Sequence, residues 1–151
     1  MSPLEGARIE RTRVESLGSD DRRLIDEAAE YRERAYAPYS GHRVGAALRT
    51  PAGRTYGGCN VENAAYGPTN CAERTAVFRA VSEGDRAFSA IAVVAGGDGF
   101  PYPCGVCRQV LAEFAQPDLR VVMANLDTGD AAIATLADLL PFSFTFEKGG
   151  Q

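Results

Sequence analysis

Residues 88–126 read FSAIAVVAGGDGFPYPCGVCRQVLAEFAQPDLRVVMANL and contain two apolar runs with a helical pattern between them. The runs at 88–96 and 119–126 are almost continuously apolar, which is typical of strands buried on both faces. Between them, residues 104–115 carry apolar side chains at helical spacing. The side chains predicted to face the core are Val106, Val110, Leu111 and Phe114. A strand, a helix and a second strand in this order predict part of a layered α/β fold.

The rest of the chain extends this pattern in both directions. A helix is predicted from Ser19, as its N-cap, to Pro38, and a hairpin of two strands follows at 44–50 and 54–63. A second helix is predicted to be capped by Asn70, with Glu73 in a capping box, and to end at Gly84. A short helix is predicted at 134–141. The order of the elements is then α-β-β-α-β-α-β-α. It predicts an α/β fold, a three-layer α/β/α sandwich with a central mixed β-sheet of about five strands.

Length and composition favour a single globular domain. The chain has 151 residues, of which 45% are hydrophobic and 24% charged, as in an ordinary soluble protein. Residues 1–18 are polar and without a pattern, so we expect a loosely held N-terminal tail there and a single domain over residues 19–147.

Charge and hydropathy exclude two classes of partner. The net charge is −4, and no dense cluster of Lys and Arg is present, so we expect no nucleic-acid partner. No apolar run approaches the ~20 residues that span a bilayer, so we expect no membrane partner. The N-terminal segment lacks the apolar core of a signal peptide, which favours the cytoplasm. Disulfides are rare there, and cysteines more often serve metals or catalysis.

Three of the four cysteines have the spacing of a metal site. Cys104 and Cys107 lie three residues apart in the first turn of a predicted helix, which places both sulfurs on one face. Cys71 lies at the start of another helix and can supply a third sulfur. A catalytic zinc has three protein ligands and one position for water. The three cysteines therefore predict one Zn²⁺ per chain.

Two charged residues, Glu73 and Arg74, lie two and three positions after Cys71. Glu73 is predicted to lie beside the metal without binding it, where a carboxylate can take a proton from water and return it to a substrate nitrogen. Arg74 is predicted to donate to a cysteine sulfur and to offset the negative charge of three thiolates. The alternatives are that Glu73 only caps the helix and that Arg74 is an ordinary surface arginine.

Two other interpretations of the cysteines remain open at this point. Cys104 and Cys107 can form a redox pair of the thioredoxin kind, which leaves Cys71 and Glu73 without a role. Alternatively, Cys59 can be a fourth ligand and close a purely structural site. Cys59 fits better as a small apolar residue inside a strand.

The segments CAE (71–73) and PCGVC (103–107) match the signature of zinc-dependent nucleobase deaminases, with cysteine in the first place. From about Leu24 to Phe144 the chain resembles the small three-cysteine cytidine deaminases. The matching segments are AYAPYS (35–40), VGAAL (44–48), GCNVENAAYG (58–67), TNCAERTA (69–76), SEGDR (82–86) and PCGVCRQVL (103–111).

This resemblance implies a reaction and a set of contacts. Zinc-activated water would attack carbon 4 of the cytosine ring of cytidine or 2′-deoxycytidine, while Glu73 moves protons to ring nitrogen 3 and to the departing ammonia. The small nucleoside would be held at its ribose by Asn60 and Glu62. Backbone groups beside Ala72 and Pro103 would read the base.

The resemblance also implies a homotetramer with shared active sites. Tyr66 and, less directly, Phe144 match aromatic residues that reach a neighbouring subunit's site in this family. The alternative is that both rings pack in the chain's own core.

One position departs from the family pattern. Where the family usually has phenylalanine against the pyrimidine, this chain has His42, its only histidine. His42 is a candidate substrate-binding residue, and it is the reason to consider a modified cytosine nucleoside, such as a blasticidin-type antibiotic, as the substrate. Two further hypotheses are a nucleic-acid cytosine editor, which the acidic charge disfavours, and a non-catalytic zinc protein, which leaves Glu73 unexplained.

Overall fold

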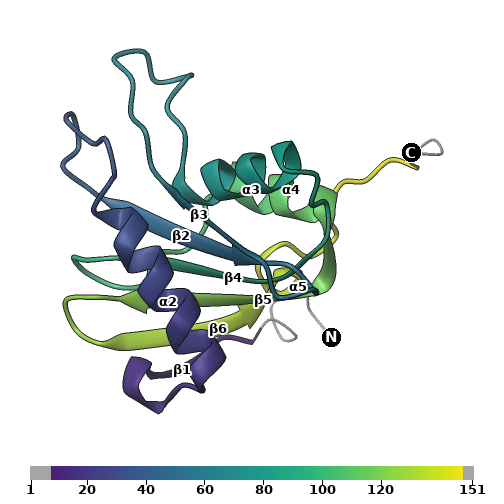
Figure 1. Cartoon of the computed structure of the whole chain (residues 1–151), viewed down its shortest axis with the longest axis horizontal. Helices are drawn as coiled ribbons and strands as arrows, with labels where there is room; N and C mark the ends of the chain where they lie inside the picture. Colours follow the sequence, from purple (N-terminus) through teal and green to yellow (C-terminus); the bar gives the residue numbers. More distant parts are fainter. Residues whose placement is uncertain (1–7, 148–151) are drawn as a thin grey trace.

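The computed structural model describes residues 8–147 (Figure 1). Its elements are strand β1 (Glu10–Arg13), a 3-10 turn (Val14–Ser16), helix α2 (Ser19–Arg32), strands β2 (Val44–Arg49) and β3 (Thr55–Cys59), helix α3 (Ala72–Ser82), strand β4 (Phe88–Ala95), helix α4 (Gly105–Phe114), strands β5 (Ala115–Asn125) and β6 (Asp130–Thr135), and helix α5 (Leu136–Leu139). The six strands form one sheet in the order β1-β6-β5-β4-β2-β3.

The centre of the sheet is the segment with the two apolar runs. Strands β4 and β5 pair in parallel, with α4 as the connection between them, and every other pair of neighbours is antiparallel. In β4 only Ser89 is exposed, because helices cover both faces of this part of the sheet. The predicted mixed sheet is confirmed.

Helix α2 packs on one face of the sheet (Figure 1). Its buried side chains Leu24, Ile25 and Ala28 belong to one apolar cluster with Val94 of β4 and Val122 of β5. These three helix positions are spaced by one, three and four residues, so they lie on one stripe of the helix.

Helices α3, α4 and α5 pack on the opposite face. Val77, Leu111 and Leu139, one from each helix, share a second apolar cluster with Val93 of β4 and Met123 of β5. The predicted three-layer α/β/α sandwich is therefore confirmed. Of the four side chains of α4 predicted to face the core, Val106 does not, since it is 57% exposed.

The sheet has six strands where about five were predicted. Residues 10–13 form an edge strand along β6, inside the segment predicted to be a loose tail; the first seven residues of that segment lie outside the described residues. An edge strand can be polar on both faces because it contributes backbone hydrogen bonds rather than a buried surface. The predicted helix at 134–141 is shorter, because residues 130–135 continue the sheet as β6.

Helix ends differ from the predicted ones at three places. Helix α2 follows Gly18, without a side-chain cap, and ends at Arg32 rather than at Pro38. Cys71, not Asn70, is the N-cap of α3, and the predicted capping box with Glu73 does not form. The Asn70 amide instead donates to the Thr75 hydroxyl at 3.1 Å. The predicted end of this helix at Gly84 agrees with the positive φ of 99° found there.

Close backbone contact fixes α3 against the sheet. A Cβ atom added at Gly58 of β3 would lie 2.5 Å from the backbone nitrogen of Ala76 and 2.7 Å from the carbonyl oxygen of Ala72, both in α3. Glycine is therefore required at this position for the first two turns of α3 to approach the sheet so closely.

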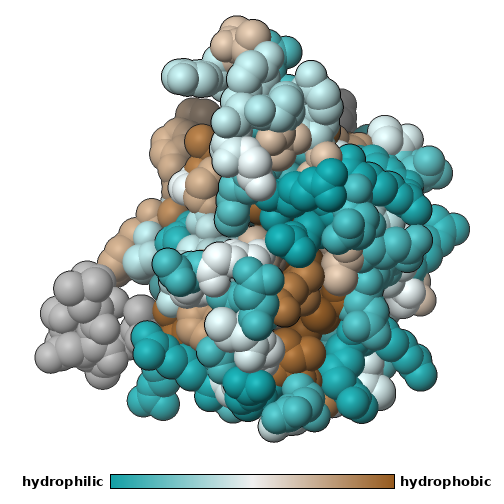
Figure 2. Space-filling model, turned by 90° about the vertical axis from the view of Figure 1, so that its left-hand side faces the viewer, coloured by the Kyte–Doolittle hydropathy of each residue, from teal (hydrophilic) through white to brown (hydrophobic). Residues whose placement is uncertain are grey.

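Within residues 8–147, no helix has the length and apolar character of a membrane span. Figure 2 shows one side of the molecule, on which hydrophilic residues predominate and an apolar strip is exposed between them.

Candidate metal centre

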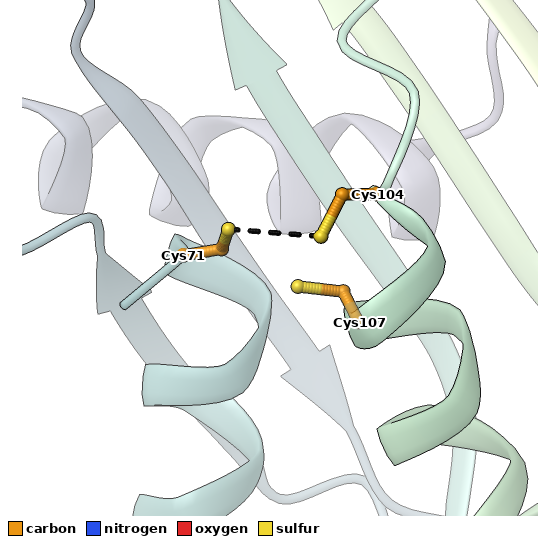
Figure 3. Close-up of side chains that lie close together, drawn as sticks. All are labelled: Cys71, Cys104 and Cys107. Carbon is orange, nitrogen blue, oxygen red and sulfur yellow. Dashed lines mark hydrogen bonds between the residues drawn. The ribbon is translucent and has the colours of Figure 1, made fainter. Parts of the chain in front are cut away.

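Three sulfur atoms meet where α3 and α4 begin (Figure 3). Cys71 is the N-cap of α3, Cys104 is the N-cap of α4, and Cys107 lies in the first turn of α4. Their Sγ atoms all lie within 4.8 Å of one another, and those of Cys71 and Cys104 are 3.8 Å apart. The structure thus brings Cys71 together with Cys104 and Cys107, which follow it in the sequence by more than thirty residues.

The position at the helix N-termini favours ionised sulfur. Unpaired backbone N–H groups give this end of a helix a partial positive charge, which stabilises a thiolate. A hydrogen bond from Cys107, together with Arg74 and Cys104, lowers the pKa of Cys71 to about 5. The pKa of Cys107 is raised, because it keeps the shared proton and is buried. Cys71 therefore ionises before Cys107.

The donor set fits a zinc ion. Three cysteine sulfurs are soft ligands of the kind that zinc binds in tetrahedral sites. With zinc–sulfur distances of about 2.3 Å, a regular tetrahedron has edges of about 3.8 Å. The separation of the Cys71 and Cys104 sulfurs equals that edge. Three sulfurs leave one corner of the tetrahedron for a ligand from outside the protein.

Cys59 does not belong to this cluster. It is half-buried in β3, and its thiol donates to the carbonyl oxygen of Arg34 at 3.5 Å. Burial raises the pKa of the Cys59 thiol, which makes it a poorer metal ligand. The interpretation of Cys59 as a fourth ligand finds no support in its contacts.

Arg74 lies against the cluster. Its Nη2 donates to the Sγ of Cys71 at 3.3 Å. The guanidinium places a positive charge beside sulfurs that carry negative charge when ionised. The alternative of an ordinary surface arginine is disfavoured, since Arg74 is only partly exposed and its Nε is buried.

Glu73 lies in the first turn of α3, where its carboxyl interacts with Cys107 and with Cys71. Its side chain is only 4% exposed. Burial raises the pKa of Glu73 to about 7, and the negative charge of Cys71 acts in the same direction. In the metal-free chain this carboxyl therefore exchanges a proton near neutral pH, which suits a group that must both accept and donate one.

Ala72 and Pro103 border the cysteines in sequence, and both are buried. The carbonyl oxygen of Pro103 accepts a hydrogen bond of 2.7 Å from Nε of Arg108. Nη1 of the same guanidinium donates to the carbonyl oxygen of Leu139 at 2.6 Å. Arg108 thus ties the segment before Cys104 to the end of α5.

The two residues predicted to bind ribose, Asn60 and Glu62, both lie in the segment that connects β3 to α3. Asn60 uses its side-chain oxygen to accept from the backbone N–H of Val44 and its amide to donate to the carbonyl oxygen of His42. One oxygen of Glu62 accepts from the backbone N–H groups of Tyr39 and Ser40, and the other from the Ser40 hydroxyl. The side-chain hydrogen bonds described for both residues are with residues 39–44 and not with the cysteines.

His42 is exposed, and its backbone is held at both ends. Its N–H donates to the Ser40 hydroxyl at 3.0 Å, and its carbonyl oxygen accepts from Asn60 at 2.8 Å. The loop that carries His42 is therefore connected to both predicted ribose-binding residues.

Tyr66 and Phe144 do not pack in the core of this chain. Tyr66 is 90% exposed and Phe144 is 66% exposed. Tyr66 lines a cavity of about 280 Å³ together with Glu62. The carbonyl oxygen of Phe144 accepts a hydrogen bond from Gln109 of α4.

Sequence reasoning missed the polar residues that hold these loops. Ser40 contacts Glu62 across 22 residues, and Arg108 contacts Leu139 across 31 residues. Neither pair has a spacing that signals a contact, because both depend on how the sheet brings distant loops together. The one local signal is the position of Arg108 directly after Cys107.

Comparison with known proteins places this site in context. Residues 18–124 match the family model for the cytidine and deoxycytidylate deaminase zinc-binding region. The chain is 53% identical to a cytidine deaminase of Sporosarcina psychrophila. The alignment has 128 residues and covers 85% of this chain and 93% of that protein. It is 30% identical to a blasticidin-S deaminase of Bacillus cereus, in an alignment of 142 residues that covers 86% of this chain and 96% of that protein.

A solved structure agrees in fold. The 1.6 Å crystal structure of a cytidine deaminase from Burkholderia pseudomallei matches with a TM-score of 0.78 and 52% sequence identity, over 82% of this chain and 98% of that one.

Proposed function

Because the chain belongs to the cytidine and deoxycytidylate deaminase family, we propose that it is a zinc-dependent hydrolase that converts cytidine and 2′-deoxycytidine to uridine and 2′-deoxyuridine with release of ammonia. The observation that carries this proposal is the buried carboxyl of Glu73 beside three converging cysteine sulfurs. A purely structural zinc site has no use for a proton carrier.

The cysteines would hold one zinc per chain, and Glu73 would move the protons. Zinc, when bound by Cys71, Cys104 and Cys107, supplies a Lewis acid that makes water nucleophilic at neutral pH. Glu73 would accept one proton from the attacking water and pass it to ring nitrogen 3, and would then take the water's second proton from the added hydroxyl group and deliver it to the amino group as it leaves. A carbon–oxygen bond forms at carbon 4, and the carbon–nitrogen bond breaks to give ammonia.

The remaining site residues would hold the nucleoside. Asn60 and Glu62 are proposed to bind the ribose, and the backbone beside Ala72 and Pro103 to read the base. These contacts are neutral or acidic, as suits a substrate without a phosphate. His42 is proposed to border the pyrimidine. The higher identity to a cytidine deaminase than to the blasticidin-S deaminase favours an unmodified nucleoside.

Turnover of a substrate panel tests this proposal. The zinc-loaded protein is incubated with cytidine, 2′-deoxycytidine, cytosine, CMP, adenosine and guanine, and ammonia release is followed. We expect release from the two cytosine nucleosides. Release from adenosine or guanine, with none from a cytosine compound, would contradict the proposal.

Glu73→Gln is the matched control, since glutamine keeps the size of the side chain but cannot carry the proton. We expect the zinc content to stay at one per chain while the rate falls by roughly 10²–10⁴-fold, the range for general acid–base catalysis. A variant that retains zinc and full activity would reject the role of Glu73.

We also propose that the protein is a homotetramer with shared active sites. The support is a set of strongly exposed aromatic side chains, Tyr66, Phe142, Phe144 and Phe146, of which Phe144 and Phe146 contact each other. Contiguous exposed apolar surface is typical of an interface. We expect sedimentation as a tetramer and a lower kcat/KM for Tyr66→Ala. A stable monomer with full activity would contradict the shared site.

A reducing compartment suits this chemistry. The described chain holds four free cysteines and no disulfide, and the three clustered thiols must stay reduced to bind a metal. We therefore propose the cytoplasm as the site of action and pyrimidine nucleoside salvage as the role.

A further inference from the structure

Residues 96–103 connect β4 to α4 and end directly at Cys104, so the course of this loop decides where Cys104 and Cys107 lie. No helix or strand runs through the loop. Gly97 and Gly99 have positive φ angles of 82° and 73°. A loop of this kind needs contacts from outside to adopt a single conformation.

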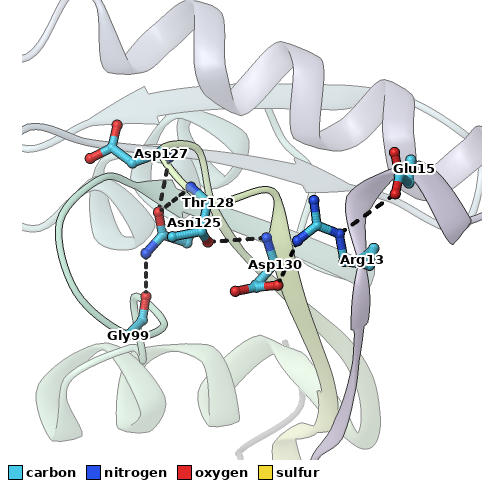
Figure 4. A network of polar contacts seen from close by, with 7 residues as sticks. All are labelled: Arg13, Glu15, Gly99, Asn125, Asp127, Thr128 and Asp130. Carbon is cyan, nitrogen blue, oxygen red and sulfur yellow. Dashed lines mark hydrogen bonds and ion pairs between the residues drawn. The ribbon is translucent and has the colours of Figure 1, made fainter.

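Asn125, the last residue of β5, supplies such contacts (Figure 4). It is only 2% exposed. Its amide nitrogen donates to the carbonyl oxygens of Gly97 at 2.9 Å and Gly99 at 2.8 Å. Its amide oxygen accepts from the backbone N–H groups of Asp127 at 2.9 Å and Thr128 at 3.2 Å. One buried side chain thus joins the loop to the turn between β5 and β6.

Asp127 binds the same loop from the turn. Its Oδ2 accepts from the backbone N–H of Gly97 at 2.7 Å. Gly97 is therefore held at both its N–H and its carbonyl group. A Cβ atom added at the neighbouring Gly96 would lie 2.6 Å from the same Oδ2, so a larger residue there would displace the Asp127 carboxylate from this position.

We propose that Asn125 and Asp127 are positioning residues that fix residues 96–103 and so set Cys104 and Cys107 opposite Cys71. This inference rests on the proposed zinc site. Zinc–ligand distances tolerate deviations of only about 0.2 Å, so a loop that shifts by more than this weakens the site even when the fold is intact. Neither residue touches the metal ligands.

A merely structural role would be to close the turn between β5 and β6. The two roles use different atoms of Asn125, which allows them to be separated. In Asn125→Asp one carboxylate oxygen still accepts from the turn, while the other faces the carbonyl oxygens of Gly97 and Gly99 without a proton to donate. This variant therefore loosens the loop and leaves the turn closed.

Asp127 offers a second pair of variants that does not disturb a buried residue. Asp127→Ala removes the acceptor for the N–H of Gly97, whereas Asp127→Asn keeps an oxygen there. Arg13→Ala serves as the control on the far side of the same turn. Arg13 pairs with Asp130 at 3.0 Å and has no described contact with residues 96–103. An exposed ion pair of this kind contributes little to stability.

The test measures zinc affinity by competition with a chelator, next to the thermal stability of the metal-free protein. We expect affinity to fall by roughly tenfold in Asn125→Asp and Asp127→Ala, the lower end of the range for residues that orient metal ligands. Asp127→Asn and Arg13→Ala should bind zinc like the wild type.

Wild-type affinity in both Asn125→Asp and Asp127→Ala would overturn the inference, even if their stability is lower. If Asn125→Asp fails to fold, the comparison of Asp127→Ala with Asp127→Asn decides the question alone. If the wild type binds zinc but releases no ammonia from cytidine, the proposed function is wrong, and the order of the affinities still supports or overturns the role of Asn125.

Discussion

At the scale of single residues, four free cysteines have two different environments. Cys71, Cys104 and Cys107 share one cluster, while the thiol of Cys59 donates a hydrogen bond to the carbonyl oxygen of Arg34. Zinc should therefore depend on the first three and not on the fourth.

Paired substitutions test this difference. We expect Cys104→Ala to lose bound zinc after dialysis, because two sulfurs fall short of the ligands that a tetrahedral site needs. Cys59→Ala should keep both zinc and activity. Zinc content measured by atomic absorption decides the matter, and loss of zinc from Cys59→Ala would favour a closed four-cysteine site instead.

The sequence predicted the three sulfurs because their spacing places them at the starts of two helices. It also predicted that Arg74 contacts a sulfur, since the two residues lie three apart on one helix. It did not predict Asn125, because an asparagine at the end of a strand has no local pattern. Its contacts with residues 97 and 99 depend on the parallel pairing of β4 and β5.

At the scale of elements, the packing of α3 on β3 places both Cys71 and Glu73. Gly58 permits this packing, since a side chain there would collide with the backbone at Ala72 and Ala76. The start of α3 is thus fixed by the sheet at the same turn that carries Glu73, the residue proposed to move the protons.

Gly58→Ala should therefore affect stability and activity together. Forcing a methyl group into a packed interface costs about 1–3 kcal/mol of unfolding free energy, and it moves Glu73 relative to Cys104 and Cys107. Urea denaturation and the ammonia assay measure the two effects. Gly67→Ala is the control for stability, because no atom lies within 4 Å of its added Cβ. An equal free energy of unfolding for both variants would show that α3 and β3 accommodate the added methyl group without loss of stability, which contradicts this account.

Most of the helices and strands were predicted, and strands β1 and β6 at one side of the sheet were not. The strands β2, β3, β4 and β5 and the helices α2, α3 and α4 follow from hydrophobic periodicity. Strand β1 was missed because its sequence, ERTR, has no apolar side to bury. Strand β6 was also missed: only its last two residues fell inside a predicted helix, the one at 134–141.

At the scale of the whole molecule, the sheet brings the site together from separate segments. The parallel pair β4 and β5 carries α4 to the same side as α3, so both helices begin near one edge and direct their N-termini at the cysteine cluster. The exposed aromatic residues of the loops and of the C-terminal segment lie outside this core and are the surface proposed for assembly.

X-ray absorption at the zinc edge tests the proposed metal centre most directly, because it counts the atoms bound to the metal in the zinc-loaded protein. We expect three sulfurs at about 2.3 Å and one oxygen at about 2.0–2.2 Å. Four sulfurs, or fewer than three, would contradict a centre that three cysteines hold and water completes.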